Sequence, residues 1–188
     1  MILADHEILD AVNSGIIAIE PKPQPTQYSS TALDLRVGDD FQKWNSKLCN
    51  VSGVATIIEL DKINMVDLQG YAEPLKIQPD GTVHIEPKDF VFVRTLEHVH
   101  LKLDSQLAAR IEGRSTAARL GMCAHISAPT IHAGFRGKIV LEILNHGPFA
   151  IKLRPNLSRI AQLIFERVNQ KPDNTIVTNY IDQQTPLG

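Results

Sequence analysis

Hydrophobic and polar residues alternate in short runs along most of the chain. From Ile16 onward, short β-branched or apolar runs are separated by Pro, Gly, Asn and Asp. The earlier runs are residues 16–19, 32–37, 54–58 and 83–85. Alternation with a period of two is typical of half-buried strands, so this spacing predicts an all-β sandwich or barrel.

The later half of the chain repeats the pattern. Six strands are expected there, at residues 90–95, 98–103, 106–111, 138–145, 150–153 and 158–167. The first three would follow one another through tight turns, and Gly147-Pro148 and Pro155-Asn156 would turn the chain between the last three.

Two short helices are expected. Asp5 would cap the first, which runs to about Ser14 and ends at Gly15. Its apolar stripe would consist of Ile8, Leu9 and Val12. The second would lie near residues 115–121, where Ala117 to Leu120 can form one or two turns before a glycine.

The irregular segments do not predict a second domain. Three prolines make residues 21–30 an ordered extended loop, and residues 61–81 are interpreted as an excursion between strands. We therefore expect one domain over residues 1–188, with a C-terminal tail that is mobile from about residue 170 unless a ligand or neighbour orders it.

Composition narrows the function classes. The 188 residues are 43% hydrophobic and 21% charged, which is typical of a globular domain. The net charge of -2 gives no field to attract a polyanion, so nucleic acid is not an expected partner. The chain shows no apolar run of about 18 residues and no leader pattern, which predicts a cytoplasmic protein without a membrane span. Two distant cysteines are interpreted as reduced thiols.

The segment from Gly113 to Glu142 concentrates the candidate chemistry. Arg114, Ser115 and Thr116 follow a strand and begin the second helix, where free backbone N–H groups, two hydroxyls and a guanidinium suit phosphate oxygens. A plain serine helix cap is the alternative interpretation.

Glu142 is the stronger candidate for a catalytic residue in that segment. It lies within an expected strand whose two faces are otherwise apolar, so its carboxylate would be desolvated and its pKa raised towards a range suited to proton transfer. Arg119 follows Ser115 by four residues and shares its helical face. The alternative for Glu142 is a structural ion pair with Arg119 or Arg114.

Metal chemistry has weak support. His84-Ile85-Glu86-Pro87 matches half of the zinc nucleobase deaminase signature, but the required Pro-Cys-x-x-Cys is absent. His98 and His100 share a strand face without a third ligand at helpful spacing. No zinc is expected.

The same segment resembles the metal-independent dCTP deaminases, a branch of the trimeric dUTPase superfamily. The pattern Gly-Arg-Ser-Ser-x-x-Arg-x-Gly is met from Gly113 to Gly121 with Thr116 for the second Ser, and His-x-Thr-Ala is met from His125 to Ala128 with Ser127 for Thr. Gly-Phe-x-Gly-x-Ile-x-Leu-Glu is complete from Gly134 to Glu142. Residues 32–38, 86–112 and 145–165 add further matches, and Tyr180-x-x-Gln183 is similar to the tail motif Tyr-x-Gly-Gln.

This resemblance implies a jelly-roll, β-barrel-like fold of the dUTPase type. It implies a homotrimer with active sites at the subunit interfaces, which deaminates dCTP to dUTP and ammonia. A magnesium ion would accompany the triphosphate, and dTTP is a candidate inhibitor.

Residue roles also follow from the resemblance. Glu142 would be the general base and acid, Ser115 and the Ala128 carbonyl would position the attacking water, and Arg119 would orient Glu142. The implied substrate-binding residues are Arg114, Ser115, Thr116, Arg119, His132, Val140, Leu141, Gln162, Tyr180 and Gln183.

One departure bears on the product. The family usually has Asp where this chain has His132, and in bifunctional relatives that Asp is tied to the water for phosphate hydrolysis. Its loss argues against dUTP hydrolysis. A dUTP pyrophosphatase or bifunctional enzyme remains the first alternative, and a non-catalytic, nucleotide-binding regulatory trimer is the second.

Overall fold

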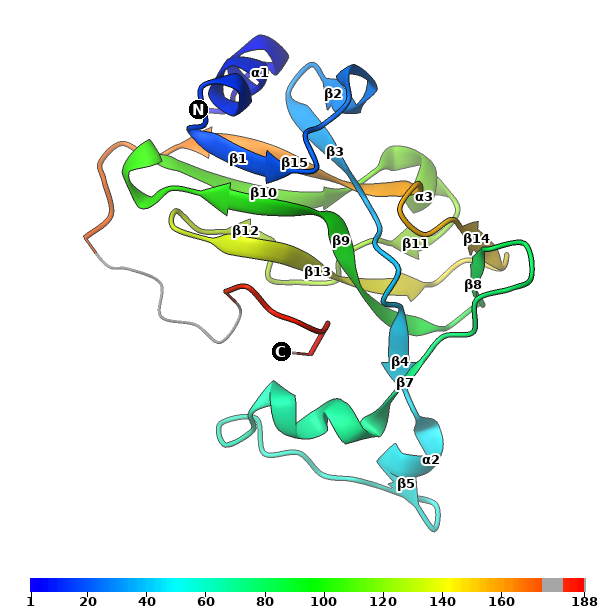
Figure 1. Ribbon diagram of the computed structural model, residues 1–188. Helices are drawn as coiled ribbons and strands as arrows, with labels where there is room; N and C mark the ends of the chain where they lie inside the picture. Colours follow the sequence, from blue (N-terminus) through cyan, green and yellow to red (C-terminus); the bar gives the residue numbers. More distant parts are fainter. Residues whose placement is uncertain (174–180, 188) are drawn as a thin grey trace.

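Two antiparallel sheets face each other in the computed structural model, which describes residues 1–173 and 181–187 (Figure 1). The first sheet has the order β11 (Met122–Cys123), β13 (Arg136–Asn145), β9 (Phe90–Leu101), β4 (Gln42–Trp44) and β7 (Ala72–Pro74), and β1 (Ile17–Glu20) also pairs with β9. The second has the order β12 (Thr130–Ile131), β10 (Leu107–Gly113), β15 (Arg159–Arg167), β3 (Ala32–Arg36) and β2 (Tyr28–Ser29). The predicted mainly-β fold is confirmed.

The remaining elements are short. Two further pairs of strands are β8 (Val83–Ile85) with β14 (Ile151–Leu153), and β5 (Asn50–Val51) with β6 (Val54–Ala55). The α-helices are α1 (Asp5–Asn13), α2 (Ser46–Cys49) and α3 (Ser115–Arg119), and the 3-10 helices are η1 (Pro25–Gln27), η2 (Met65–Tyr71) and η3 (Leu103–Ser105). Helix α3 confirms the helix expected near residues 115–121.

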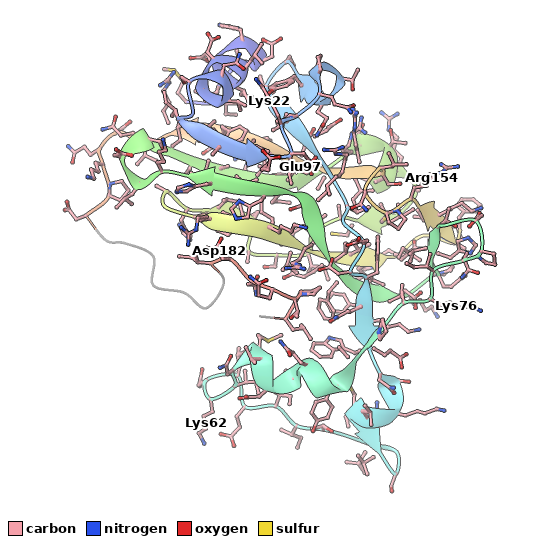
Figure 2. All side chains as sticks on the ribbon, in the orientation of Figure 1. Lys22, Lys62, Lys76, Glu97, Arg154 and Asp182 are labelled. Atoms are coloured by element: carbon pink, nitrogen blue, oxygen red, sulfur yellow. The ribbon has the colours of Figure 1, made fainter. Side chains whose placement is uncertain are left out.

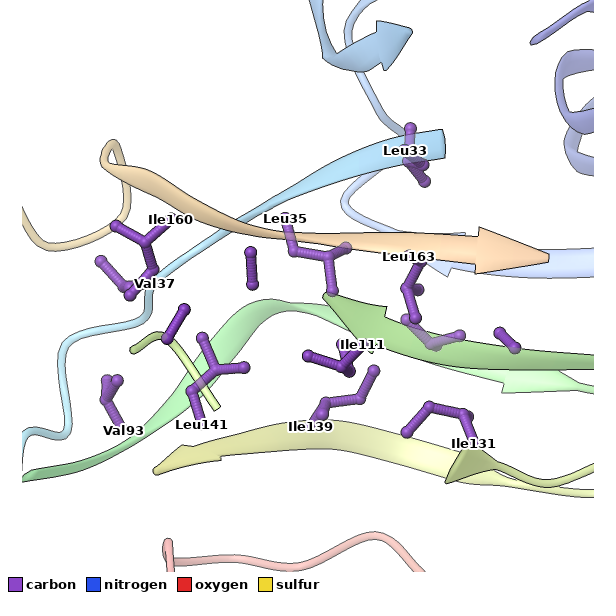
Figure 3. Packing of buried hydrophobic residues seen from close by; sticks show 14 of the residues in the cluster. Leu33, Leu35, Val37, Val93, Ile111, Ile131, Ile139, Leu141, Ile160 and Leu163 are labelled. Atoms are coloured by element: carbon purple, nitrogen blue, oxygen red, sulfur yellow. The ribbon is translucent and has the colours of Figure 1, made fainter. Parts of the chain in front are cut away.

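The hydrophobic core fills the space between the two sheets (Figure 3). Alternate residues of β13, namely Ile139, Leu141 and Ile143, are at most 4% exposed and face the inner side of the second sheet, where Leu35 and Leu163 are fully buried. Each such side chain stabilises the fold by about 1.5–3 kcal/mol through removal of apolar surface from water. The predicted period of two along this strand is confirmed.

Strand β9 differs from its prediction. Residues 90–95 and 98–103 do not form two strands joined by a turn, because β9 runs without interruption from Phe90 to Leu101. Glu97, which reads as a polar break in the sequence, is 0% exposed and faces the core. Its carboxylate accepts hydrogen bonds from the Arg36 Nε at 2.7 Å, the Arg36 backbone N–H at 2.8 Å and the Gln27 Nε2 at 3.0 Å.

Helix α1 is present, but its cap and buried face differ from the prediction. Ala4 occupies the cap position, and its backbone N–H donates to the Glu7 side chain at 2.9 Å, whereas Asp5 is the first helical residue. Ile8 and Ala11 are buried and Leu9 is 41% exposed, so the helix is rotated relative to the expected stripe. Gly15 has a φ of +73° and ends the helix as expected.

The excursion expected around residues 61–81 is confirmed, and it begins earlier in the chain. Residues 45–71 extend below the first sheet in Figure 1 and carry α2, the β5–β6 hairpin and η2. Only Val54 and Ala55 of the strand expected at residues 54–58 are paired. This arm matters for function because η2 closes one side of the cavity described below.

A close backbone contact fixes α3 relative to β13. A Cβ added to Gly147 would lie 1.9 Å from the Leu120 carbonyl oxygen, and one added to Gly121 would lie 2.5 Å from the Gly147 Cα, so both positions require glycine. Asn145 holds the turn, because its buried side chain donates to the Ile85 and Phe149 carbonyls and accepts from the Gly147 N–H at 3.0 Å. The end of β13 and the end of α3 are thereby held together.

Candidate active site

A cavity of about 460 Å3 lies on the outer face of β13. Its volume is in the range of small-ligand sites. The lining residues come from η2, from strands β9 and β13, from β12 with its flanking loops, and from the C-terminal tail. They are Met65, Phe92, His125, Ala128, Thr130, Ile131, His132, Phe135, Lys138, Ile139, Val140, Glu142, Gln183, Pro186 and Leu187.

Glu142 is the carboxylate of this cavity. Its side chain is 33% exposed, and burial raises its pKa above the ordinary value. The His125 imidazole and a backbone hydrogen bond from Ser127 act in the opposite direction and lower the pKa. A half-buried carboxyl group with a raised pKa can accept a proton from a bound molecule and return it.

Among the side chains that the structure describes, His125 pairs with Glu142. The His125 Nδ1 lies 3.4 Å from the Glu142 Oε2, and the His125 side chain is only 8% exposed. The alternative interpretation named Arg119 or Arg114 as the partner, and Arg114 instead pairs with Asp34. An imidazole at this distance stabilises the ionised carboxylate when it carries a proton.

The loop that carries Ala128 is held in an unusual backbone conformation. Ala128 has a φ of +58°, in the left-handed region that residues other than glycine rarely adopt. Such strain persists only where the surroundings enforce it, and it is common at binding sites. Ala128 lines the same cavity as Glu142, and the preceding residue, Ser127, gives a backbone hydrogen bond to the Glu142 carboxylate.

A second polar cluster lies on the other sheet. Asp34 of β3 is 6% exposed, and it pairs with the Arg114 Nε at 3.2 Å and the Arg159 Nη1 at 4.0 Å. Burial raises the pKa of Asp34, and the two guanidinium groups lower it. Gln162 of β15 lies directly between Asp34 and Glu112 in the strand register. Ser115 and Thr116 begin α3 at the edge of this cluster, and both are exposed.

The structure therefore divides the predicted site residues into two groups. Glu142, Ala128, His132, Val140 and Gln183 line the cavity. Among the described residues of the chain, the cavity lining does not include the predicted residues Arg114, Ser115, Thr116, Arg119, Leu141 and Gln162.

Three of the predicted residues need a separate description. Arg119 lies exposed at the end of α3. Leu141 is fully buried with its side chain in the core, so only its backbone could reach a ligand at the cavity. Tyr180 lies outside the described residues.

Several lining residues were not singled out from the sequence. Met65 comes from the arm and Phe92 from β9, and neither carries a pattern that marks it as functional. His125 was only part of the His-x-Ser-Ala match, without a role. Phe92 makes an edge-to-face contact with Trp44, with ring centroids 4.9 Å apart, and this contact fixes one wall of the cavity.

Two further findings concern membranes and metals. No helix in residues 1–173 or 181–187 is long and apolar enough to cross a membrane. Within the same ranges, no group of three or more His, Cys, Asp and Glu side chains has the arrangement of a metal site.

Comparison with known proteins gives consistent matches in sequence. The family model described as dCTP deaminase-like matches residues 2–168. A protein of Methanosphaera stadtmanae named dCTP deaminase, dUMP-forming, is 33% identical over 174 residues, covering 91% of this chain and 83% of its own. A dCTP deaminase of Shewanella baltica is 34% identical over 198 residues, covering 100% of this chain and 97% of its own.

A solved structure shares the fold. The crystal structure of 2'-deoxycytidine 5'-triphosphate deaminase from Agrobacterium tumefaciens matches with a TM-score of 0.63 and 21% identity. The match covers 87% of this chain and 47% of that chain, so the present chain corresponds to about half of the Agrobacterium protein. At this identity, the match supports the fold alone.

Proposed function

The chain belongs to the dCTP deaminase-like family, and from this membership we propose that it hydrolyses dCTP to dUTP and ammonia. The observation that carries the proposal is Glu142, a half-buried carboxylate with a raised pKa that lines a cavity of small-ligand size. The strained Ala128 backbone in the same cavity lining supports this assignment.

The chemistry follows from that carboxylate. Ionised Glu142 takes a proton from a water molecule, and the water oxygen attacks C4 of cytosine to give a tetrahedral carbon. The carboxyl group then gives this proton to the ring nitrogen N3, and it carries the remaining proton of the C4 hydroxyl to the amine, which makes the amine a neutral leaving group. The C4–N4 bond breaks, ammonia leaves, and C4 retains the new oxygen as the uracil carbonyl.

A water-positioning role for the Ala128 carbonyl agrees with its place in the cavity lining. Ala128 and Glu142 lie on different segments of the lining, so their oxygens would accept hydrogen bonds from the water on two sides. These two acceptors would orient a lone pair of the water towards the base. His132, Val140 and Gln183 line the same cavity and would contact the nucleoside.

The phosphate-binding residues would come from a second copy of the chain. One group of predicted ligands combines a helix start with hydroxyls and guanidinium groups, and it consists of Arg114, Ser115, Thr116, Arg119 and Gln162. In the part of the chain that the structure describes, none of these residues lines the cavity of its own chain. A ring of identical subunits would bring this group from one copy to the Glu142 cavity of the next. We propose the homotrimer on this basis.

Magnesium would enter as a complex with the triphosphate. Mg2+ commonly keeps several waters and binds through substrate phosphates, and it needs few protein ligands. Its chemistry there would be charge neutralisation of the triphosphate, and inhibition by dTTP at the same site belongs to the proposal.

The assay that tests the function uses purified protein with magnesium and either dCTP or dUTP, with nucleotides resolved by ion-exchange chromatography and ammonia measured separately. Conversion of dCTP to dUTP, with dUTP inert, is the expected result. Binding of dCTP without ammonia release would indicate that the protein is a regulatory nucleotide-binding protein and not a deaminase.

Release of dUMP is the second candidate outcome, because the relative from Methanosphaera is named dUMP-forming. His132 argues for dUTP, since an imidazole stands at the cavity where the resemblance places a carboxylate for the phosphate step. Pyrophosphate and dUMP from either substrate would favour the bifunctional enzyme.

We expect His132→Asp to lower KM for dCTP by about two- to tenfold, because a carboxylate accepts a hydrogen bond from a sugar hydroxyl. Steady-state kinetics measure this change. His146→Asp, at an exposed residue that follows β13, is the matched control and should leave KM unchanged. An unchanged KM and product in His132→Asp would show that His132 does not contact the sugar.

The acid side of the pH profile reports on Glu142. Activity requires the ionised base, so kcat/KM should fall as the pH drops through the raised pKa of Glu142. Since His125 lowers that pKa, His125→Gln should move the midpoint of the acid limb to higher pH. Profiles from pH 4 to 8 measure the shift. His6→Gln, on exposed α1, should leave the midpoint in place, and a midpoint that is unmoved in His125→Gln would contradict the assigned pairing.

A further inference from the structure

The last described segment of the chain is docked on the first sheet and forms part of the cavity lining. In Figure 1 the tail, drawn in red, lies between β13 and the arm that carries η2. Leu187 is 2% exposed, and Gln183, Pro186 and Leu187 line the cavity that contains Glu142. The Gln69 Nε2 of η2 donates to the Thr185 Oγ1 at 3.2 Å, which joins the tail to the arm.

Asp182 connects this tail to the sheet. Its carboxylate accepts a hydrogen bond from the Arg136 Nε at 2.6 Å, pairs with the same guanidinium through Nη2, and lies 3.0 Å from the His98 Nε2. Its backbone N–H donates to the Arg136 carbonyl at 2.9 Å. Figure 2 shows Asp182 at the lower face of the sheet, beside the strands that supply these partners.

The backbone at Asp182 also points to a specific arrangement. Its φ is +52°, a left-handed conformation that Asp tolerates better than most residues other than glycine. A Cβ added to Gly137, which has a φ of +150°, would lie 3.1 Å from the Asp182 nitrogen. The tail therefore follows the backbone of β13 closely, and the Asp182 carboxylate is turned towards Arg136.

The next residue is held by a different cation. The Arg94 Nη1 donates to the Gln183 carbonyl oxygen at 2.5 Å. Arg94 is oriented in turn by Asp40, which accepts from the Arg94 backbone N–H at 3.0 Å and pairs with the Arg94 Nε. Two adjacent residues of the tail are thus anchored to β9 and β13, and the second of them, Gln183, lines the cavity.

We propose that Asp182, His98 and Arg136 form a clamp that positions Gln183 over the substrate, so that Asp182 is a positioning residue for the reaction. The identity of the substrate that Gln183 meets rests on the proposed function, whereas the clamp itself rests on the contacts above. The resemblance places Gly at this point of the tail motif, so the charged clamp is a property of this chain.

The clamp is of moderate strength because its three side chains are partly exposed to solvent. The side chains of Asp182, His98 and Arg136 are 35%, 41% and 53% exposed, so solvent screens the pairs. The Arg136 guanidinium and then His98 lower the pKa of Asp182, so its charge is present throughout the neutral range. A pair of this kind shifts a docking equilibrium by about two- to fivefold, which is enough to be measured and too little to unfold the sheet.

The experiment compares Asp182→Asn, Arg136→Gln and the double variant in the full chain. Asparagine keeps the size of the side chain and tolerates a positive φ. Hydrogen exchange of C-terminal fragments should rise about two- to fivefold in each single variant. The double variant should match Asp182→Asn, because that single variant has already lost the pairs with both Arg136 and His98. KM for dCTP should rise by a similar factor with kcat less affected, and the denaturation midpoint should stay within experimental error.

Asp173→Asn is the matched control, because Asp173 is an exposed tail carboxylate outside the docked segment, and it should change neither exchange nor KM. Unchanged exchange in Asp182→Asn, or effects that add in the double variant, would overturn the clamp. Faster exchange with an unchanged KM would show that the clamp does not position Gln183. If the wild-type protein fails to deaminate dCTP, the proposed function fails while the exchange data still decide whether the clamp exists.

Discussion

Replacing Glu142 with glutamine is expected to reduce deamination by about 100- to 10,000-fold, the range typical of general acid and base catalysis. Glutamine has nearly the same shape as glutamate but cannot accept the proton from water. Because Glu142 lies on the outer face of β13 and is half-buried, the substitution should leave the core, the proposed trimer and nucleotide binding intact. Ammonia release under single-turnover conditions and dCTP binding by calorimetry measure the two effects separately.

Glu112→Gln is the matched control, because Glu112 is an exposed carboxylate of β10 that pairs with Arg110 at 3.6 Å and lies on the other sheet. It should retain most of the wild-type rate. If Glu142→Gln kept near wild-type turnover, Glu142 could not be the base, and water activation would have to be assigned to another group.

Replacing Glu97 with alanine is expected to lower the free energy of unfolding by about 3–5 kcal/mol, which is the cost of removing one partner of a buried ion pair. Glu97 is 0% exposed and Arg36 is 13% exposed at the side chain, so the guanidinium would lose its counterion in a poorly solvated place. The Arg36 backbone N–H and the Gln27 Nε2 would also lose an acceptor. This loss is a large fraction of the stability of a typical domain.

Urea denaturation at one fixed protein concentration measures the change, because association contributes to the stability of an oligomer. Glu166→Ala is the control, since Glu166 pairs with Arg110 at 3.1 Å while its side chain is 39% exposed, and it should cost less than about 1 kcal/mol. Equal losses in the two variants would show that the Glu97 pair does not stabilise the fold.

The strands were predictable where the hydrophobic pattern is local. Ile139, Leu141 and Ile143 alternate with polar or half-buried residues, and β13 was recognised from that period alone. Strand β9 was divided in error into strands at residues 90–95 and 98–103, and the buried residue Glu97 lies between them. Its burial depends on Arg36, which lies 61 residues earlier in the chain, and no local pattern contains that partner.

The candidate site shows the same limit. The resemblance pointed to Glu142, Ala128 and Gln183, and the structure brings these three to one cavity. The pairing of Glu142 with His125 was not predicted, since it depends on how the loop before β12 folds back onto β13. The contact of Asp182 with Arg136 spans 46 residues, and only the docked tail reveals it.

The sequence by itself determined the mainly-β class, the short helix that begins at Ser115, and the presence of a carboxylate inside an apolar strand. These properties depend on neighbouring residues, whose period and turn propensities act over a few positions. The tertiary structure decided which charges meet, namely Glu142 with His125, Glu97 with Arg36, and Asp182 with Arg136. It also decided that Glu142 lies in the first sheet, whereas helix α3 follows β10 of the second sheet. Such pairings are set by sheet order and register, which join distant segments through the packing of the whole core.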